Sequence, residues 1–166
     1  MSLEELYREL CKILRNKTMI ACVGSPLRSD DQAGLLLYNL LKDKGLPIVE
    51  CEYGLENCML EISEYKPEKL LIIDAVYSEK LEPGDLVLLD ENSIREELPV
   101  TSTHNIPLKQ VLALLKHVAG VKEIYLLGVQ VKSIELGDRV SPEVCESIKK
   151  LAIVLEKTYR ECRKGD

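Results

Sequence analysis

Residues 69–76 read KLLIIDAV, the most apolar run of the chain, which carries one acid, Asp74, close to its end. A short continuous run of this kind is typical of a strand that is buried on both faces of a parallel sheet. Similar runs recur along the chain, at residues 18–24, 46–52, 85–90 and 123–131. We therefore expect a sheet of about five strands, an ordinary size, with residues 69–76 in a central position.

Segments with apolar residues at helical spacing separate these runs. They cover residues 3–15, 32–44, 56–65, 104–118 and 141–162. Strands that alternate with helices predict an α/β fold in three layers, α/β/α, with a mostly parallel sheet. A length of 166 residues suits one domain. We expect residues 1–166 to form it, with an amino-terminal helix over 1–16 and a core over 18–163.

The composition argues against two classes of function. Lys and Arg number 22 against 28 Asp and Glu, a net charge of −6, and the chain has no Trp and no Phe. Binding to nucleic acid is therefore disfavoured. No apolar run approaches the roughly 20 residues that span a bilayer, and residues 1–17 are amphipathic, without the apolar centre of a secretory signal. We expect a cytoplasmic protein that does not insert into membranes, and a monomer.

The six cysteines show no metal-binding spacing. They are Cys11, Cys22, Cys51, Cys58, Cys145 and Cys162, and no pair of them forms a CxxC motif. A structural zinc site therefore has little support. In a reducing compartment we expect all six to be reduced thiols, and we expect Cys11 and Cys22 to be small core residues.

Polar residues that follow strands are the first candidates for a functional site, because ligands of open α/β sheets bind beyond the carboxyl ends of the strands. Residues 24–34, GSPLRSDDQAG, follow the first predicted strand. They lack both GxGxxG and GKS/T, and two aspartates would repel a phosphate. Ser29, Asp30 and Asp31 could instead cap the next helix. Alternatively, one aspartate is a metal ligand or an acid–base group; Asp30 is the better capping candidate.

Asp74 and His104 lie at equivalent places further along the chain. An acid at the end of an apolar strand is costly to bury, so Asp74 either caps the following turn or has a function. His104, in the stretch TSTHN, stands where a loop meets a helix, whereas His117 lies late in its helix and is interpreted as a packing or solvent-facing residue. If Asp31, Asp74 and His104 converge, they form an O/O/N set for a divalent metal with open positions. The chain has no GxSxG motif, which disfavours a Ser–His–Asp triad.

The order of four motifs resembles that of the hydrogenase maturation endopeptidases. The motifs are CVGSPLRSDDQAG at 22–34, LLIIDAV followed by EPGDLVLLD, TSTHNIPLKQVLALL at 101–115, and GVQVKSIELGDRVSPEV at 128–144. The resemblance as a whole extends over residues 18–160. The third motif is most similar to the branch that serves formate-hydrogenlyase-type and energy-converting hydrogenases.

The resemblance implies an endopeptidase that removes a C-terminal extension from the nickel-loaded precursor of a nickel–iron hydrogenase large subunit. The residues that would act on this substrate, by binding its nickel, are Asp31, Asp74 and His104. The residues that would recognise the substrate, in the loop YGLENC at 53–58, are Gly54, Glu56 and Asn57. The family holds no permanent cofactor, so nickel would come with the substrate, and any divalent ion in a crystal would be adventitious.

Three positions depart from the usual family pattern. Ser25 stands where Asn is common, Asp31 where many members have Glu, and Val131 where Pro is frequent. The first two occur in the same branch, whereas the third could alter a loop. An alternative function is a non-catalytic module that holds a metal-loaded partner or a small anionic ligand. A fixed loss of mass from the precursor distinguishes the protease from this module.

Overall fold

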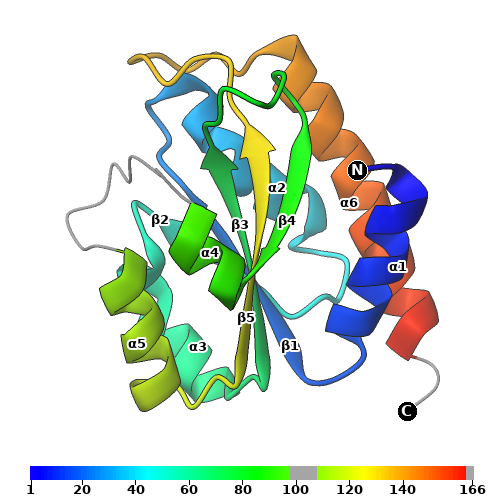
Figure 1. Ribbon diagram of the computed structural model, residues 1–166, viewed down its shortest axis with the longest axis vertical. Coiled ribbons are helices and arrows are strands. Elements are labelled where there is room, and N and C mark those ends of the chain that lie inside the picture. Colours follow the sequence, from blue (N-terminus) through cyan, green and yellow to red (C-terminus); the bar gives the residue numbers. More distant parts are fainter. Residues whose placement is uncertain (98–107, 164–166) are drawn as a thin grey trace.

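The computed structural model describes residues 1–97 and 108–163, which form a five-stranded sheet between two layers of helices (Figure 1). The strands are β1 (Thr18–Gly24), β2 (Ile48–Glu52), β3 (Lys69–Val76), β4 (Leu86–Asp90) and β5 (Glu123–Gln130). The helices are α1 (Leu3–Leu14), α2 (Ala33–Leu41), α3 (Met59–Tyr65), α4 (Glu91–Glu97), α5 (Leu108–Val118) and α6 (Pro142–Cys162), with the short 3-10 turns η1 (Ser29–Gln32) and η2 (Leu55–Cys58).

The strand order is β2-β1-β3-β5-β4, so the KLLIIDAV strand is central as predicted. Pairs β1–β2, β1–β3 and β3–β5 are parallel, and only the edge strand β4 runs antiparallel to its neighbour β5. The mostly parallel α/β/α fold is thereby confirmed. Helix α4 is an addition to the elements predicted from the sequence; it begins directly after β4, where Asp90 Oδ1 accepts a hydrogen bond of 2.8 Å from Ser93 N.

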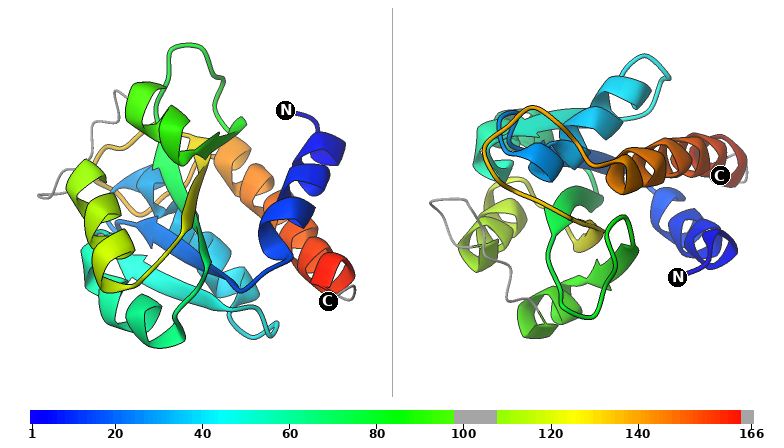
Figure 2. Two further views of the ribbon diagram at one scale, coloured as in Figure 1. Left: turned by 60° about the horizontal axis from the view of Figure 1, so that its bottom comes forward. Right: turned by 90° about the horizontal axis from the view of Figure 1, so that it is seen from above.

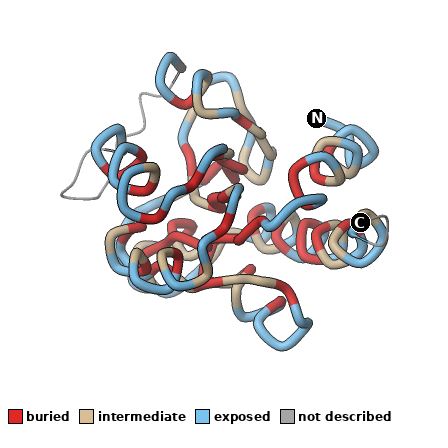
Figure 3. Tube along the Cα trace, turned by 90° about the horizontal axis from the view of Figure 1, so that it is seen from below, coloured by how far each residue is buried: buried red, intermediate tan, exposed pale blue. Residues whose placement is uncertain are grey.

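Successive residues of the central strand point to opposite helix layers. Leu70 and Ile72 pack into a core with α3, α4 and α5, whereas Leu71 and Ile73 pack into a second core with α1, α2 and α6. All four side chains are at most 3% exposed. The buried segments consequently follow the interior between the layers, and exposed segments lie on the outer faces of the helices (Figure 3). Among the helices of the described residues, none is both long and apolar enough to cross a membrane.

Four of the six cysteines form disulfides, so the expectation of six reduced thiols is wrong. Cys11 of α1 is bonded to Cys162 of α6, with Cα atoms 5.4 Å apart, and Cys51 of β2 is bonded to Cys58 of η2, with Cα atoms 5.2 Å apart. Both separations lie in the range that a disulfide needs. Packing of α1 beside α6 brings together two cysteines 151 residues apart, which spacing alone does not reveal. Cys22 and Cys145 are free.

Candidate active site

Asp31 and Asp74 come together at the carboxyl end of the sheet. Asp74 lies near the end of β3, opposite Gly128 of β5, and Asp31 lies in η1, which follows β1. Asp31 is 7% exposed, and Asp74 is partly buried. These two predicted site residues therefore meet in the crevice region that the strand-end rule indicates.

Two glycines let the η1 segment lie close against β1. A Cβ atom on Gly24 would lie 2.5 Å from the carbonyl oxygen of Asp31, and one on Gly34 would overlap the backbone of Val23. The Ser25 N–H donates to the same Asp31 carbonyl at 3.1 Å. The backbone that carries the Asp31 carboxylate is therefore fixed to the end of the first strand, and the motif GSPLRSDDQAG needs glycine at both ends for this reason.

The Asp74 carboxyl group has a pKa well above its ordinary value. Burial is the largest cause, and the negative charge of Asp31 adds to it, while a hydrogen bond from the Ala75 N–H opposes both. When two neighbouring carboxyl groups are both ionised they repel each other, and a cation between them relieves this repulsion. Sites rich in oxygen ligands suit divalent ions. The pair can thus bind metal, or the Asp74 carboxyl group, with its raised pKa, can act as an acid or base.

His104 lies within residues 98–107, outside the residues that the structure describes. Its convergence with the two aspartates stays a prediction. Within residues 1–97 and 108–163, no group of three or more His, Cys, Asp or Glu side chains is arranged to hold a metal ion. The two carboxylates therefore supply only part of a metal-binding set on their own.

Asp30 has a different structural role from Asp31. Its fully buried carboxylate accepts hydrogen bonds from the N–H groups of Lys132 (2.8 Å), Ser133 (3.0 Å) and Ser141 (2.7 Å), and from the Ser141 hydroxyl. Burial alone would raise the pKa of Asp30, but these hydrogen bonds outweigh it and lower the pKa. Asp30 therefore holds the segment between β5 and α6.

The predicted capping of the next helix by this motif is wrong. Neither η1 nor α2 receives a hydrogen bond from a side chain at its N-cap. The Ser29 hydroxyl donates instead to the Glu135 carbonyl at 2.7 Å. Ser141 occupies the N-cap of α6, with Pro142 at the first position, but its side chain donates to Asp30 and caps no α6 amide. The sequence analysis missed this role because the partners lie more than 100 residues apart.

The predicted recognition loop lies beside the Asp31 segment. Tyr53 N–H donates to the Gly24 carbonyl at 2.8 Å, which joins the loop to the end of β1. Gly54 has a φ of 150°, and the Glu56 carboxylate folds over it where a side chain would otherwise stand. The Asn57 side chain donates to the Glu52 carbonyl at 2.7 Å. The Cys51–Cys58 disulfide closes the two ends of this loop.

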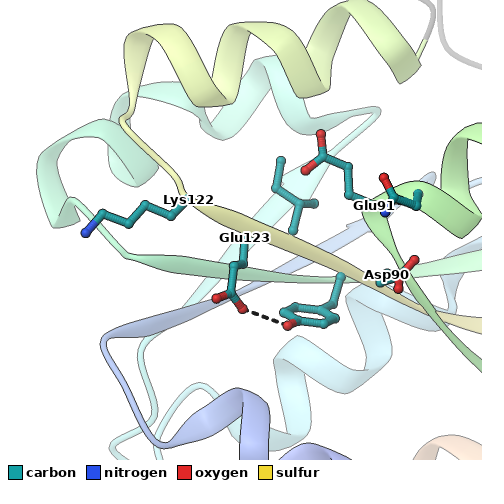
Figure 4. A pocket seen from close by; sticks show the side chains of 7 residues that line it. Asp90, Glu91, Lys122 and Glu123 are labelled. Atoms are coloured by element: carbon teal, nitrogen blue, oxygen red, sulfur yellow. Dashed lines mark hydrogen bonds between the residues drawn. The ribbon is translucent and has the colours of Figure 1, made fainter.

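A small pocket at the opposite end of the sheet is a poor candidate for the active site (Figure 4). It encloses about 170 Å³ near the start of β5 and is lined by Asp90, Glu91, Asn92, Lys122, Glu123, Ile124 and Tyr125. Three of its polar side chains have partners inside the protein: Glu91 pairs with Lys116 at 2.6 Å, and Tyr125 donates to Glu123 at 2.7 Å. These contacts account for the Glu91 and Glu123 carboxylates without a ligand.

Known proteins share both this fold and this sequence pattern. The family model HycI, hydrogenase maturation protease, matches residues 40–158. The NiFe hydrogenase maturation protease HybD from Thermococcus kodakarensis is 31% identical, with a TM-score of 0.72 over 85% of this chain and 97% of that one. The endopeptidase HycI from Escherichia coli is 29% identical, with a TM-score of 0.70 over 85% and 90%. No curated protein matches the sequence.

A second structure from Thermococcus kodakarensis, the NiFe hydrogenase maturation protease HycI, has the same fold: its TM-score is 0.78 over 92% of this chain and 99% of that one, at 24% identity. The chain belongs to the hydrogenase maturation protease family. It is accordingly an enzyme, an endopeptidase of the class that matures hydrogenases.

Proposed function

We propose that the protein removes a C-terminal extension from the nickel-loaded precursor of a nickel–iron hydrogenase large subunit, and that Asp31, Asp74 and His104 bind the nickel of that substrate. Membership of the family supports the cleavage. The observation that carries the site is the electrostatic contact between Asp31 and the partly buried Asp74 at the carboxyl end of the sheet. We place this reaction in the cytoplasm. We assign it to a single copy of the chain, because both aspartates come from the same chain.

The two carboxylates give the site its preference for a cation. Without one, burial and the charge of Asp31 disfavour ionisation of Asp74, so part of the free energy of binding comes from relieving this repulsion. Two oxygens and one imidazole nitrogen leave coordination positions open. Ligands that already hold nickel in the precursor would fill them, so the ion would bridge enzyme and substrate.

Two mechanisms are compatible with this site. Nickel held by the three side chains polarises the scissile carbonyl or activates water. Alternatively, nickel only positions the precursor, and a carboxylate such as Asp74, with its raised pKa, acts as the base. Exchange of nickel for an ion of different Lewis acidity separates them, because only the first makes the cleavage rate depend on the ion once binding is saturated.

Recognition of the precursor involves the loop after β2. Gly54, Glu56 and Asn57 follow Tyr53, whose N–H donates to the Gly24 carbonyl at the end of β1, and hydrogen bonds together with the Cys51–Cys58 disulfide fix the shape of the loop. We assign the substrate to the branch of formate-hydrogenlyase-type and energy-converting hydrogenases on the motif at residues 101–115. This assignment rests on the resemblance alone.

Mass spectrometry of the precursor tests the proposed function. Incubation of a nickel-loaded large-subunit precursor with the purified protein should yield one shorter product of fixed mass. His104→Ala should abolish the product and leave the melting temperature close to that of the wild type. His117→Ala is the matched control, since that histidine lies on α5 away from the site, and it should process normally. An unchanged precursor mass with the wild type would contradict the proposal.

A further inference from the structure

The segment between β5 and α6 lies over the segment that carries Asp31 (Figure 1; Figure 2, right). We call residues 25–32 and 131–141 together the clasp. Gly137 N–H donates to the Leu27 carbonyl at 3.0 Å, and Ser29 N–H donates to the Gly137 carbonyl at 3.0 Å. These backbone contacts join two segments more than 100 residues apart into a single structural unit next to the candidate active site.

Several hydrogen bonds, most of them partly buried, keep the clasp in one shape. The Asp30 carboxylate accepts four hydrogen bonds from the 131–141 segment and its junction with α6. The Asp30 N–H also donates to the Ser133 carbonyl at 3.0 Å, and the Gln32 side chain donates to the Asp138 carbonyl at 3.1 Å. Charge-assisted bonds to a buried carboxylate are among the stronger contacts in a protein. The outer surface of the clasp is therefore preorganised.

That outer surface carries exposed apolar side chains. Leu136 is 84% exposed, Leu27 is 61% exposed and Ile134 is 38% exposed. Arg28 and Gly137 form a parallel bridge, which places the preceding residues, Leu27 and Leu136, next to each other in register. Exposed leucines on one preorganised unit are a common mark of a protein–protein contact.

The charges of the clasp favour an apolar partner over a strongly charged one. Its basic residues are the half-buried Arg28 and the exposed Lys132 and Arg139, and its exposed acidic residues are Glu135 and Asp138. Lys132 already pairs with Glu143 of α6 at 2.9 Å. The remaining positive and negative charges balance, so the clasp has no strong electrostatic field that would attract a charged partner. Burial of apolar side chains is therefore the main source of affinity for a partner.

We infer that Leu27, Ile134 and Leu136 form a docking surface for an apolar area on the folded body of the large-subunit precursor. This inference rests on the proposed function, in which the substrate is a protein that brings its metal to Asp31. The Asp31 N–H donates to the Arg28 carbonyl at 3.0 Å. The docking surface and Asp31, the proposed nickel ligand, therefore lie within one turn of the chain. A folded protein whose metal reaches Asp31 has to lie against the clasp.

The folded body of the precursor is a better candidate than its C-terminal extension for binding to this docking surface. The metal belongs to the folded body, and the surface that surrounds it approaches the residues that surround Asp31. The predicted site for peptide recognition is a different segment, the loop at 53–58. That loop is joined to the end of β1 by the hydrogen bond from Tyr53 N–H to the Gly24 carbonyl. The clasp would thus bind the folded body of the precursor, and the loop at 53–58 would bind its C-terminal extension.

The test is the double variant Leu27→Ser, Leu136→Ser in the full chain. Binding of the nickel-loaded precursor is measured by biolayer interferometry, and its cleavage by mass spectrometry. Loss of two buried leucine contacts should raise Kd and KM about tenfold or more, with kcat nearly unchanged. The melting temperature should stay that of the wild type, because both side chains are exposed.

The matched control is Ile153→Ser on α6. Ile153 is 68% exposed and lies 11 residues beyond the start of that helix, about 16 Å along its axis. It should leave Kd, KM and kcat unchanged. A synthetic peptide of the C-terminal extension should bind the wild type and the double variant equally.

The outcomes separate this inference from the proposed function. Absence of cleavage by the wild type counts against the proposed function alone, because binding is measured independently. An unchanged Kd for the precursor in the double variant overturns the docking surface. Weaker binding of the extension peptide in the double variant overturns the assignment to the folded body, and an equal effect of Ile153→Ser overturns the special role of the clasp.

Discussion

Asp30 and Asp31 are consecutive residues whose carboxylates serve different parts of the molecule. Asp30 accepts hydrogen bonds from three backbone N–H groups and one hydroxyl of the segment 132–141, whereas Asp31 lies close enough to Asp74 to raise the pKa of that carboxyl. The 3-10 conformation of η1 separates the two side chains. Asp30 fixes the local structure, and its neighbour Asp31 is the residue that we propose as a ligand of the substrate's nickel.

The first prediction contrasts alanine variants of these two acids. Asp30→Ala leaves three partly buried N–H groups without an acceptor, so we expect the free energy of unfolding to fall by about 3 kcal/mol. Asp31→Ala should change stability far less and should abolish processing of the precursor. Urea unfolding and mass spectrometry of the product check the two effects. An Asp30→Ala variant as stable as the wild type would contradict the assignment.

The second prediction concerns pH and Asp74. A carboxyl group whose pKa is higher in the folded than in the unfolded state binds more protons when folded, so the free energy of unfolding falls as pH rises between the two values. Asp74→Asn removes this loss. In metal-free protein we expect the variant to gain stability over the wild type across the pH range above the ordinary pKa of an aspartate, measured by urea unfolding. A constant difference across that range would be evidence against the raised pKa.

The third prediction concerns Gly34, which lies against the backbone of Val23. Gly34→Ala has to push α2 away from β1, so we expect a loss of stability of about 1–3 kcal/mol, although alanine favours helices. Asn39→Ala is the control, because Asn39 is exposed on the same helix and should be neutral or slightly stabilising. Thermal unfolding compares the two variants. Equal melting temperatures would show that the close approach is dispensable.

The fourth prediction concerns the disulfide at the recognition loop. Cys51→Ser with Cys58→Ser removes a short covalent loop, so we expect a loss of about 2–3 kcal/mol in the free energy of unfolding and a higher KM for the precursor. Cys145→Ser, at a free cysteine, should change neither. Mass spectrometry after alkylation counts the thiols of the wild type. Six alkylated cysteines in the folded protein would contradict both disulfides.

Much of the fold is predictable because its signals are local. Apolar runs such as residues 69–76 are too long and uniform for a surface strand, and the helices between them impose parallel pairing. Helix α4 also has a local signal, the acceptor Asp90 three residues before Ser93, which the sequence analysis did not use. Its short length makes it easy to overlook.

The candidate site is predictable in part for the same reason. Asp31 and Asp74 each follow an apolar strand, and parallel strands bring such residues to one edge. The role of Asp30 is not predictable in this way, because its partners Lys132, Ser133 and Ser141 are remote in sequence. A motif rich in acids before a helix looks the same whether it caps that helix or holds a distant loop. The Cys11–Cys162 bond depends likewise on the packing of two terminal helices.

The central claim is that the enzyme recognises nickel that its substrate already carries. The most direct measurement offers the purified, metal-free protein two otherwise identical large-subunit precursors, one nickel-loaded and one nickel-free, and follows their masses over time. We predict that only the nickel-loaded precursor is shortened, without added metal, and that Asp31→Asn processes neither. Equal cleavage of both precursors, or a strict need to load the enzyme itself with metal first, would contradict the claim.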